Sequence, residues 1–329
     1  MEKSRQLIAV GLTAGLLFSS LSGCTTNPAT GESVFTGMSS NEQELRVGRE
    51  QHPQIIKAFG GRFGSPELRR YVDSIGQLLA RTVERKTFKY TFTLLNSKIV
   101  NAFALPGGYI YISRGLMALA ENEAELAGVL AHELGHINAL HHGRREGQGL
   151  LANILLAGVG IAGGRAAADL GSLVVGSALR SYSREHELES DSLALRYMSR
   201  AGYDPEAMVY FLRKMRASSR LQARRQGKSP DKVDEFNYLA THPAPAERVR
   251  LASQQARKYQ VKKPMRARNI YLRKINGMLY GDAPDQGLIR GRIFSHPKLK
   301  FRFEVPEGFS LFNTPKAVFA KGPNDATII

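Results

Sequence analysis

The sequence GVLAHELGHINALHH, residues 128–142, holds four of the eight histidines in a chain of 329 residues. His132, Glu133 and His136 in this segment form the pattern H-E-x-x-H. Residues four apart lie on one face of an α-helix, so both imidazoles can bind the same zinc ion. Glu133 is placed beside them to act as a general base on a water molecule. Core histidines on a purely structural helix are the alternative, but they would bury polar groups at a cost.

A catalytic zinc site needs a third protein ligand and an open fourth position. His142 stands six residues after His136, where the pattern H-E-x-x-H-x-x-G-x-x-H places its third ligand. That pattern needs a glycine at position 139 to turn the chain, whereas this sequence has Ala139, a helix former. We therefore predict that the helix continues past Ala139 and that neither His141 nor His142 binds zinc.

The third ligand is expected in the segment SREHELESDSLALRYMSR, residues 183–200. As a helix, this segment places Glu187 and Asp191 one turn apart on the face that should be buried. Buried acids need a partner. We predict that Glu187 binds zinc and that Asp191 steadies a ligand histidine by a hydrogen bond. The alternative is an ion pair between these acids and an arginine in the core.

Four segments occur in a fixed order: NAFALPGGYIYISRGL, LAHELGHI, YSREHELESD and THPAPAERVRL. In this order they resemble peptidase family forty-eight, zinc metallopeptidases of the gluzincin type that include CAAX prenyl endopeptidases and soluble periplasmic relatives. The resemblance covers about residues 40–260. It implies one Zn²⁺ per chain, with Glu187 and Asp191 as the E-x-x-x-D motif that supplies the third ligand. It also implies that His242 points into the site, where it either stabilises the oxyanion or closes the site.

The resemblance further implies a cleft edge against which an extended substrate adds as a β-strand. Its residues are Asn101, Ala102, Phe103, Ala104, Leu105, Pro106, Gly107 and Gly108. We expect an α+β fold: a mostly helical zincin-like metalloprotease domain over residues 41–264, with a small β-sheet edge at the cleft. Within it, the patterns predict a capped helix at 65–85, a strand at 88–95 and a long helix from Leu116 into the histidine segment.

The N-terminus has the layout of an export signal. Residues 1–23 begin with basic side chains, continue with an apolar stretch and end at LSGC, which resembles a bacterial lipoprotein signal. Cys24 is the only cysteine of the chain and is the expected lipidation site; an ordinary signal peptide that contains a thiol is the alternative. Thr25, rather than aspartate, favours the outer membrane by the same resemblance. Residues 24–40, rich in Thr, Ser and Gly, are expected to be a tether.

Two further segments stand apart by composition. Residues 149–179 contain two apolar, glycine-rich runs, each too short to span a bilayer, and we interpret them as a helical hairpin that is buried or lies on a membrane surface. Residues 265–329 are expected to be a short β-rich appendix, because KLKFRFEV alternates apolar and charged side chains. The abrupt end at DATII suggests that this appendix is truncated.

The charge balance bears on the partners. The chain has a net charge of +17, with basic runs at 212–228 and 256–268. Export makes nucleic acid an improbable partner, so a solvated surface or anionic lipid headgroups remain. We predict a lipid-anchored zinc endopeptidase on the periplasmic face of the bacterial outer membrane, acting on unfolded or misassembled envelope proteins. The alternatives are an envelope chaperone or assembly lipoprotein with a latched, mostly silent metal site, and a lipoprotein that binds surfaces through its basic runs.

Overall fold

The computed structural model describes residues 23–37, 39–148, 182–225, 229–230, 242, 246–313, 317–323 and 326–328. The predicted signal peptide up to residue 22 and the predicted apolar hairpin at 149–179 lie outside the described residues. None of the described helices is long and apolar enough to cross a membrane. Helices dominate the described chain and the sheets are small, so the predicted α+β class is confirmed.

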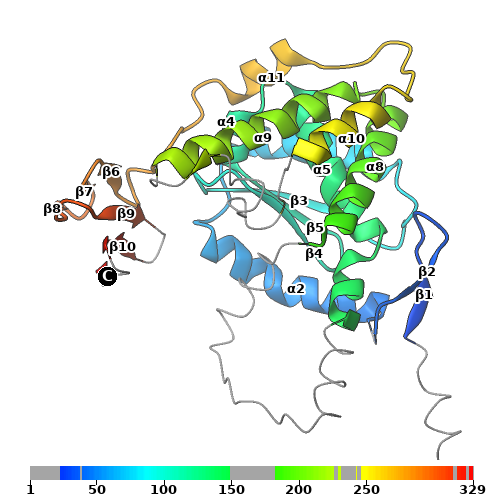
Figure 1. Cartoon of the computed structure of the whole chain (residues 1–329), viewed down its shortest axis with the longest axis horizontal. Coiled ribbons are helices and arrows are strands. Elements are labelled where there is room, and N and C mark those ends of the chain that lie inside the picture. Colours follow the sequence, from blue (N-terminus) through cyan, green and yellow to red (C-terminus); the bar gives the residue numbers. More distant parts are fainter. Residues whose placement is uncertain are drawn as a thin grey trace, which may run out of the picture.

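A three-stranded sheet lies beside the histidine helix (Figure 1). Its strands are β3 (Thr91–Leu95), β4 (Ala102–Leu105) and β5 (Tyr109–Ser113), in the order β3-β5-β4. β5 pairs parallel with β3 and antiparallel with β4, which therefore forms one edge of the sheet. The predicted PGG turn joins β4 to β5, and Gly107 and Gly108 both have positive φ angles, 80° and 89°, that glycine adopts without strain. The predicted strand at 88–95 is confirmed as β3.

The described residues form eight named helices. They are α2 (Asn41–Ala58), α3 (Pro66–Ala80), α4 (Arg114–Leu119), α5 (Glu123–Asn138), α8 (Arg184–Arg200), α9 (Glu206–Arg225), α10 (Ala246–Ala256) and α11 (Arg268–Ile275). The predicted cap of α3 is present, because Ser65 accepts a hydrogen bond from the backbone of Leu68. Every residue of α5 is buried, so this helix runs through the centre of the core and packs along α8.

The helix predicted to run from Leu116 into the histidine segment is two helices. α4 ends at Leu119, and Asn122 caps α5 by accepting a hydrogen bond from the backbone of Glu125. Asparagine competes for backbone hydrogen bonds and favours a cap over a helix interior. α4 and α5 are therefore separate helices, each with its own N-terminal cap.

The segment predicted as a tether is a structured hairpin in its first part. β1 (Cys24–Thr26) pairs antiparallel with β2 (Ser33–Phe35), and the turn between them carries a buried Asn27. Asn27 and Ala29 both contact α8, through hydrogen bonds with Glu189 and Arg196. The tether was predicted because the segment is rich in Thr, Ser and Gly. The contacts with α8 that order the hairpin join residues far apart in the chain, so they are not visible in the local sequence.

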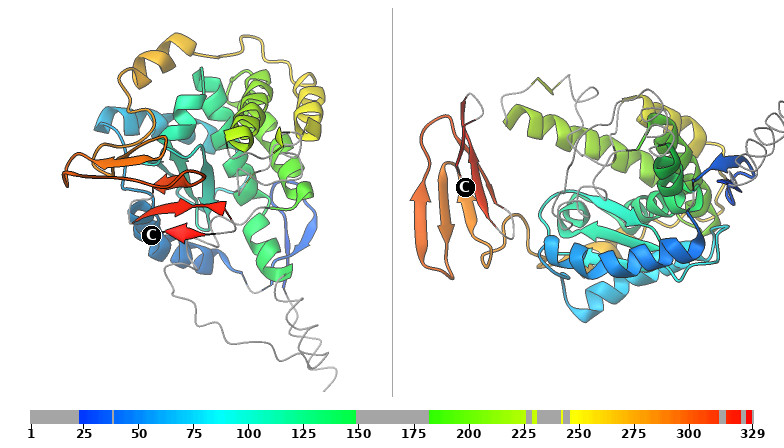
Figure 2. Two further views of the ribbon diagram at one scale, coloured as in Figure 1. Left: turned by 60° about the vertical axis from the view of Figure 1, so that its left-hand side comes forward. Right: turned by 90° about the horizontal axis from the view of Figure 1, so that it is seen from below.

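The C-terminal region begins with a helix rather than a strand. Residues 265–287 contain α11, where the buried Tyr271 donates a hydrogen bond to the backbone of Met117. The strands follow as two small sheets set apart from the helical body (Figure 2). They are β6 (Leu288–Arg290), β7 (Ile293–His296) and β8 (Phe301–Glu304) in one, and β9 (Ser310–Asn313), β10 (Val318–Lys321) and β11 (Thr327–Ile328) in the other.

Candidate metal centre

Two helices supply the centre. The side chains of His132 and His136 project from one face of α5, with their Nε2 atoms 3.0 Å apart. Glu187 reaches them from α8, with its Oε2 atom 3.3 Å from His132 Nε2 and its Oε1 atom 3.4 Å from His136 Nε2. Ligands about 2.0–2.2 Å from a tetrahedral zinc lie roughly 3.3–3.6 Å apart, so this spacing is close to what the ion requires.

His242 joins the same group. Its Nδ1 atom lies 2.8 Å from Glu187 Oε1 and 3.2 Å from His132 Nε2. Ligand atoms of His132, His136, Glu187 and His242 all lie within 4.8 Å of one another, and all four side chains are buried. The structure thus brings together the four residues that the sequence nominated for the metal or its fourth position.

The charge of the cluster also fits a divalent cation. Three acids, Glu133, Glu187 and Asp191, are buried here, against one buried guanidinium, Arg248. If all four are ionised, the cluster has a net charge of −2. A buried net charge requires a compensating charge of opposite sign. Burial lowers the pKa of His132, but hydrogen bonds to Asp191 and Glu187 outweigh it and raise that pKa to about 9. The acids therefore attract positive charge to the position of the predicted metal.

Asp191 lies where the sequence placed it, on the buried face of α8. Its Oδ1 atom is 2.9 Å from His132 Nδ1, on the side of the ring away from the cluster. A carboxylate at this position fixes the tautomer of a ligand histidine and leaves Nε2 free to bind metal. The hydroxyl of Ser190, next to Asp191, also donates a hydrogen bond to the backbone of His132.

The alternative partner, a core arginine, is present as well. Arg248 of α10 contacts Asp191 through Nε at 2.8 Å and Nη2 at 2.7 Å, and contacts Glu187 Oε2 through Nη1 at 2.5 Å. The ion pair and the metal site therefore coexist rather than exclude each other. Arg248 was not predicted from the sequence, although it lies in the segment PAERVRL that carries the family resemblance.

Glu133 is the acid best placed for proton transfer. Its Oε1 atom lies 3.3 Å from His242 Nε2, and its Oε2 atom is buried without a hydrogen-bond partner among the described residues. Burial raises the pKa of its carboxyl group, against the opposing effect of His242 and His132. A carboxyl group with a raised pKa and an uncommitted oxygen suits a general base.

An apolar pocket opens next to Glu133. The edge strand contributes Ala102 and α5 contributes Val129, while His132, Glu133, His242 and Arg248 line its polar end. Its remaining lining residues are Leu116, Gly128, Met208, Phe211, Leu212 and Met215. The predicted cleft edge, Asn101 to Gly108, thus has its first strand residue at the site, with β4 packed beside α5.

The prediction that α5 continues past Ala139 is wrong. The helix ends at Asn138, and Leu140 takes a positive φ of 59° before a new helical segment at 141–148. Ala139 favours a helix, but tertiary contacts override this local preference. His142 contacts the hydroxyl of Tyr182 rather than the cluster, at 2.8 Å from its Nε2 atom. That His142 and His141 do not bind zinc therefore stays a prediction, now for a different geometric reason.

Residues 66–256 match the model of Peptidase family M48. The chain belongs to this family. M48 is a family of peptidases, and the buried His-His-Glu-His cluster is a group that could hold a metal ion. M48 is the family that the four sequence segments resembled, so this identification is confirmed.

Curated relatives extend the comparison. The beta-barrel assembly-enhancing protease of Escherichia coli (strain K12) is 29% identical over 261 residues, which cover 76% of this chain and 51% of the relative. The mitochondrial metalloendopeptidase OMA1 of Schizosaccharomyces pombe is 24% identical over 228 residues, which cover 67% of this chain and 63% of the relative. The chain thus spans about half the length of the bacterial relative.

Gly135 offers a test of how the two ligand helices approach. A Cβ atom at this position would lie 2.6 Å from Ser190 Oγ and 3.0 Å from the Ser190 carbonyl oxygen. We expect Gly135→Ala to push α8 from α5, lower the free energy of unfolding by about 1–3 kcal/mol and weaken zinc binding. Chemical denaturation and zinc titration measure the two effects. Gly128→Ala is the control: its Cβ atom would meet the side chains of Met208 and Met198 rather than the backbone of α8, so we expect zinc affinity to stay unchanged. Unchanged zinc affinity in Gly135→Ala would contradict the argument.

Proposed function

We propose that this chain is a zinc-dependent endopeptidase, anchored by a lipid on Cys24 at the periplasmic face of the bacterial outer membrane. Its substrates are peptide bonds of unfolded or misassembled envelope proteins. The observation that carries the proposal is the buried cluster of His132, His136 and Glu187 with Glu133 beside it. The name of the bacterial relatives, beta-barrel assembly-enhancing protease, supports the substrate class. Nucleic acid is not a proposed partner.

The chemistry divides among the residues as follows. His132, His136 and Glu187 hold one Zn²⁺, which when bound supplies Lewis-acid chemistry for hydrolysis of a carbonyl group. The Glu133 carboxylate takes a proton from the attacking water and later passes it to the leaving amine. Asp191 holds the ring of His132, and Arg248 holds both Asp191 and Glu187 in place. The acids of α8 are therefore oriented before any substrate arrives.

The cleft edge orients the substrate. β4, residues Ala102–Leu105, is an edge strand, and a peptide in extended conformation that pairs with it runs alongside α5. This pairing requires His142, which contacts the backbone of Ala104, to move aside. The apolar side chains of Val129, Phe211 and Leu212 beside this edge provide an apolar surface against which a side chain of the peptide packs. Such pairing uses backbone groups, which suits substrates that are unfolded and varied in sequence. The basic runs of the surface provide a second, electrostatic contact with the membrane.

The role of Glu133 is tested by Glu133→Gln. We expect the variant to bind close to one zinc per chain but to lose peptide hydrolysis by several orders of magnitude, because both proton transfers depend on the carboxylate. Metal analysis and a peptide-library cleavage assay measure the two quantities. His132→Ala serves as the reference for a lost ligand. Loss of zinc in Glu133→Gln as large as in His132→Ala would show that Glu133 is a ligand instead.

His242 supports a second candidate, a latched site. In the described conformation its Nδ1 atom lies 2.8 Å from Glu187 Oε1, inside the ligand group. With His242 in the fourth position, all four positions of the zinc are filled by protein, as in structural rather than catalytic sites. The resting chain would then be silent, which is the state required of a chaperone or assembly lipoprotein.

His242→Ala separates the interpretations by casein cleavage. If His242 latches the site in this conformation, as its distances favour, removal raises the cleavage rate above that of the wild type. If His242 stabilises the oxyanion instead, the rate falls by about 10²–10³-fold, the typical loss for one such donor. Absence of cleavage in both proteins, with zinc bound, would favour the chaperone function over the peptidase.

The lipid anchor is tested at Cys24. This side chain is exposed at the start of β1, and it is the only cysteine in the sequence. We expect Cys24→Ala to abolish metabolic labelling with a lipid precursor and to release the chain from the membrane fraction. Cys24→Ala that is labelled as strongly as the wild type would rule out Cys24 as the modified residue.

A further inference from the structure

His136 uses only one of its two ring nitrogens in the cluster. Its Nε2 atom faces His132 and Glu187, whereas its Nδ1 atom lies 2.8 Å from His141 Nδ1. His141 is fully buried and is no member of the ligand group. If Nε2 of His136 binds the metal, its Nδ1 atom carries the hydrogen and must donate it to His141.

The next bond follows from the first. Because His141 Nδ1 accepts, its hydrogen sits on Nε2 in the neutral ring, and this atom lies 3.1 Å from Glu189 Oε2. A carboxylate can only accept, so the direction of both bonds is determined. His136 thus contacts its carboxylate through an intervening imidazole, whereas His132 contacts Asp191 directly.

Glu189 is in turn held by two donors. Arg144 Nη1 lies 2.7 Å from its Oε2 atom, and Asn27 Nδ2 lies 2.9 Å from its Oε1 atom. The orientation of the Asn27 amide is fixed, because its Oδ1 atom accepts a hydrogen bond from the backbone of Ala29 at 2.9 Å. Asn27 is fully buried and Glu189 is part-exposed, so their contact is partly shielded from water.

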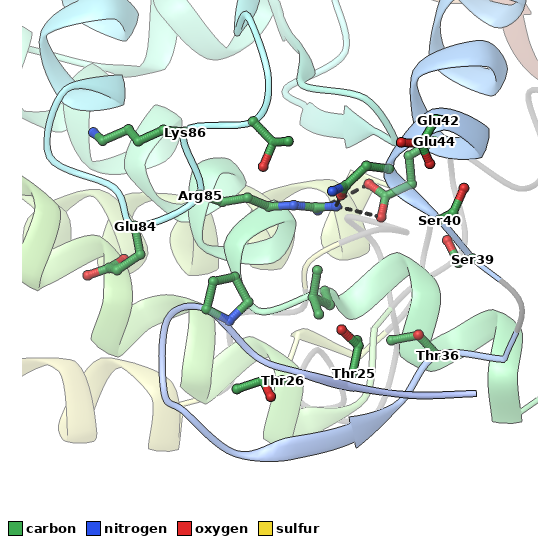
Figure 3. Close-up of a pocket in the computed structure, with 14 residues that line it drawn as sticks. Thr25, Thr26, Thr36, Ser39, Ser40, Glu42, Glu44, Glu84, Arg85 and Lys86 are labelled. Carbon is green, nitrogen blue, oxygen red and sulfur yellow. Dashed lines mark hydrogen bonds and ion pairs between the residues drawn. The ribbon is translucent and has the colours of Figure 1, made fainter. Parts of the chain in front are cut away.

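Asn27 belongs to the hairpin that begins at Cys24. On its other side this hairpin borders a polar pocket, lined by Thr25, Ser40, Glu44 and Arg85 among others (Figure 3). The Arg85 side chain forms an ion pair with Glu44 of α2 rather than with the hairpin. The side of the hairpin that meets α8, with Asn27 and the Ala29 carbonyl, therefore provides its polar attachment to the metal-binding helices.

We propose that Asn27, Glu189 and His141 form a hydrogen-bonded relay that positions His136 for zinc, so that the hairpin next to the anchor supports the metal site. The inference rests on the proposed function, because it requires zinc at His136. All three are positioning residues, since they act on the metal only through His136. The N-terminal hairpin and the peptidase site are thereby one hydrogen-bonded unit.

The test compares four single variants and one double variant of the full chain. His141→Leu removes both bonds of the relay at similar volume, and His141→Gln restores an acceptor and a donor. Asn27→Asp keeps the acceptor for Ala29 but replaces the donor to Glu189 with an oxygen, while Thr30→Asp adds the same charge at an exposed position of the turn. Zinc affinity is measured by chelator competition, and the absorption spectrum of the Co²⁺-loaded protein reports the ligand geometry. Thermal unfolding of the metal-free proteins serves as the folding control.

We expect His141→Leu to weaken zinc binding by about 10- to 100-fold and to alter the Co²⁺ spectrum, as losses behind a ligand histidine do. His141→Gln should recover most of that loss. Asn27→Asp should weaken binding in the same direction but less, and Thr30→Asp should match the wild type. The double variant Asn27→Asp with His141→Leu should bind zinc no more weakly than His141→Leu alone, because one relay is already broken.

Other results overturn the relay. Wild-type zinc affinity and Co²⁺ spectrum in folded Asn27→Asp would disconnect the hairpin from the site, and fully additive losses in the double variant would show two independent effects. If His141→Leu does not fold, Asn27→Asp and His141→Gln still decide the matter. These results leave the proposed peptidase standing when the wild type binds zinc and cleaves casein. A wild-type chain without zinc affinity would remove the proposed function together with the relay.

Discussion

The structure depends on negative charge buried between two helices. Glu187 and Asp191 of α8, together with Glu133 of α5, lie inside the core, and among the described residues one guanidinium, that of Arg248, offsets them. Desolvated carboxylates are costly unless a cation compensates them. A divalent ion held, as we propose, by His132, His136 and Glu187 would supply the charge that Arg248 does not. The packing of α5, α8 and α10 around the cluster therefore holds these acids close together.

The ligand residues can meet only because α5 and α8 approach each other closely. Gly135 has no side chain, so α5 can lie against the backbone of Ser190 in α8, and Glu187 can reach both histidines. Each ligand histidine is then fixed from behind: His132 by Asp191, and His136 by His141. The edge strand β4 and the apolar pocket are adjacent to this assembly, so a peptide bound as proposed would lie next to Glu133.

The sequence predicted the parts of this site that follow from helical spacing. The four-residue intervals of His132–His136 and Glu187–Asp191 determine which face each side chain occupies, and both faces are as expected. It did not predict the end of α5 at Asn138, because the turn at Leu140 is imposed by packing rather than by the local preference of Ala139. Arg248 and the hairpin at Asn27 were missed for a related reason. Each contacts α8 across a long stretch of chain, and such contacts leave no periodic pattern in a single sequence.

We infer that zinc is held jointly by side chains of α5 and α8. The number of zinc ions per chain tests this inference. Zinc per chain is to be measured by elemental analysis in the wild type, Glu187→Ala and His142→Ala, with folding monitored by circular dichroism. We expect close to one zinc per chain in the wild type and in His142→Ala, because His142 contacts Tyr182 instead of the cluster. We expect a strongly reduced content in Glu187→Ala. Zinc retained in Glu187→Ala and lost in His142→Ala would contradict the inference.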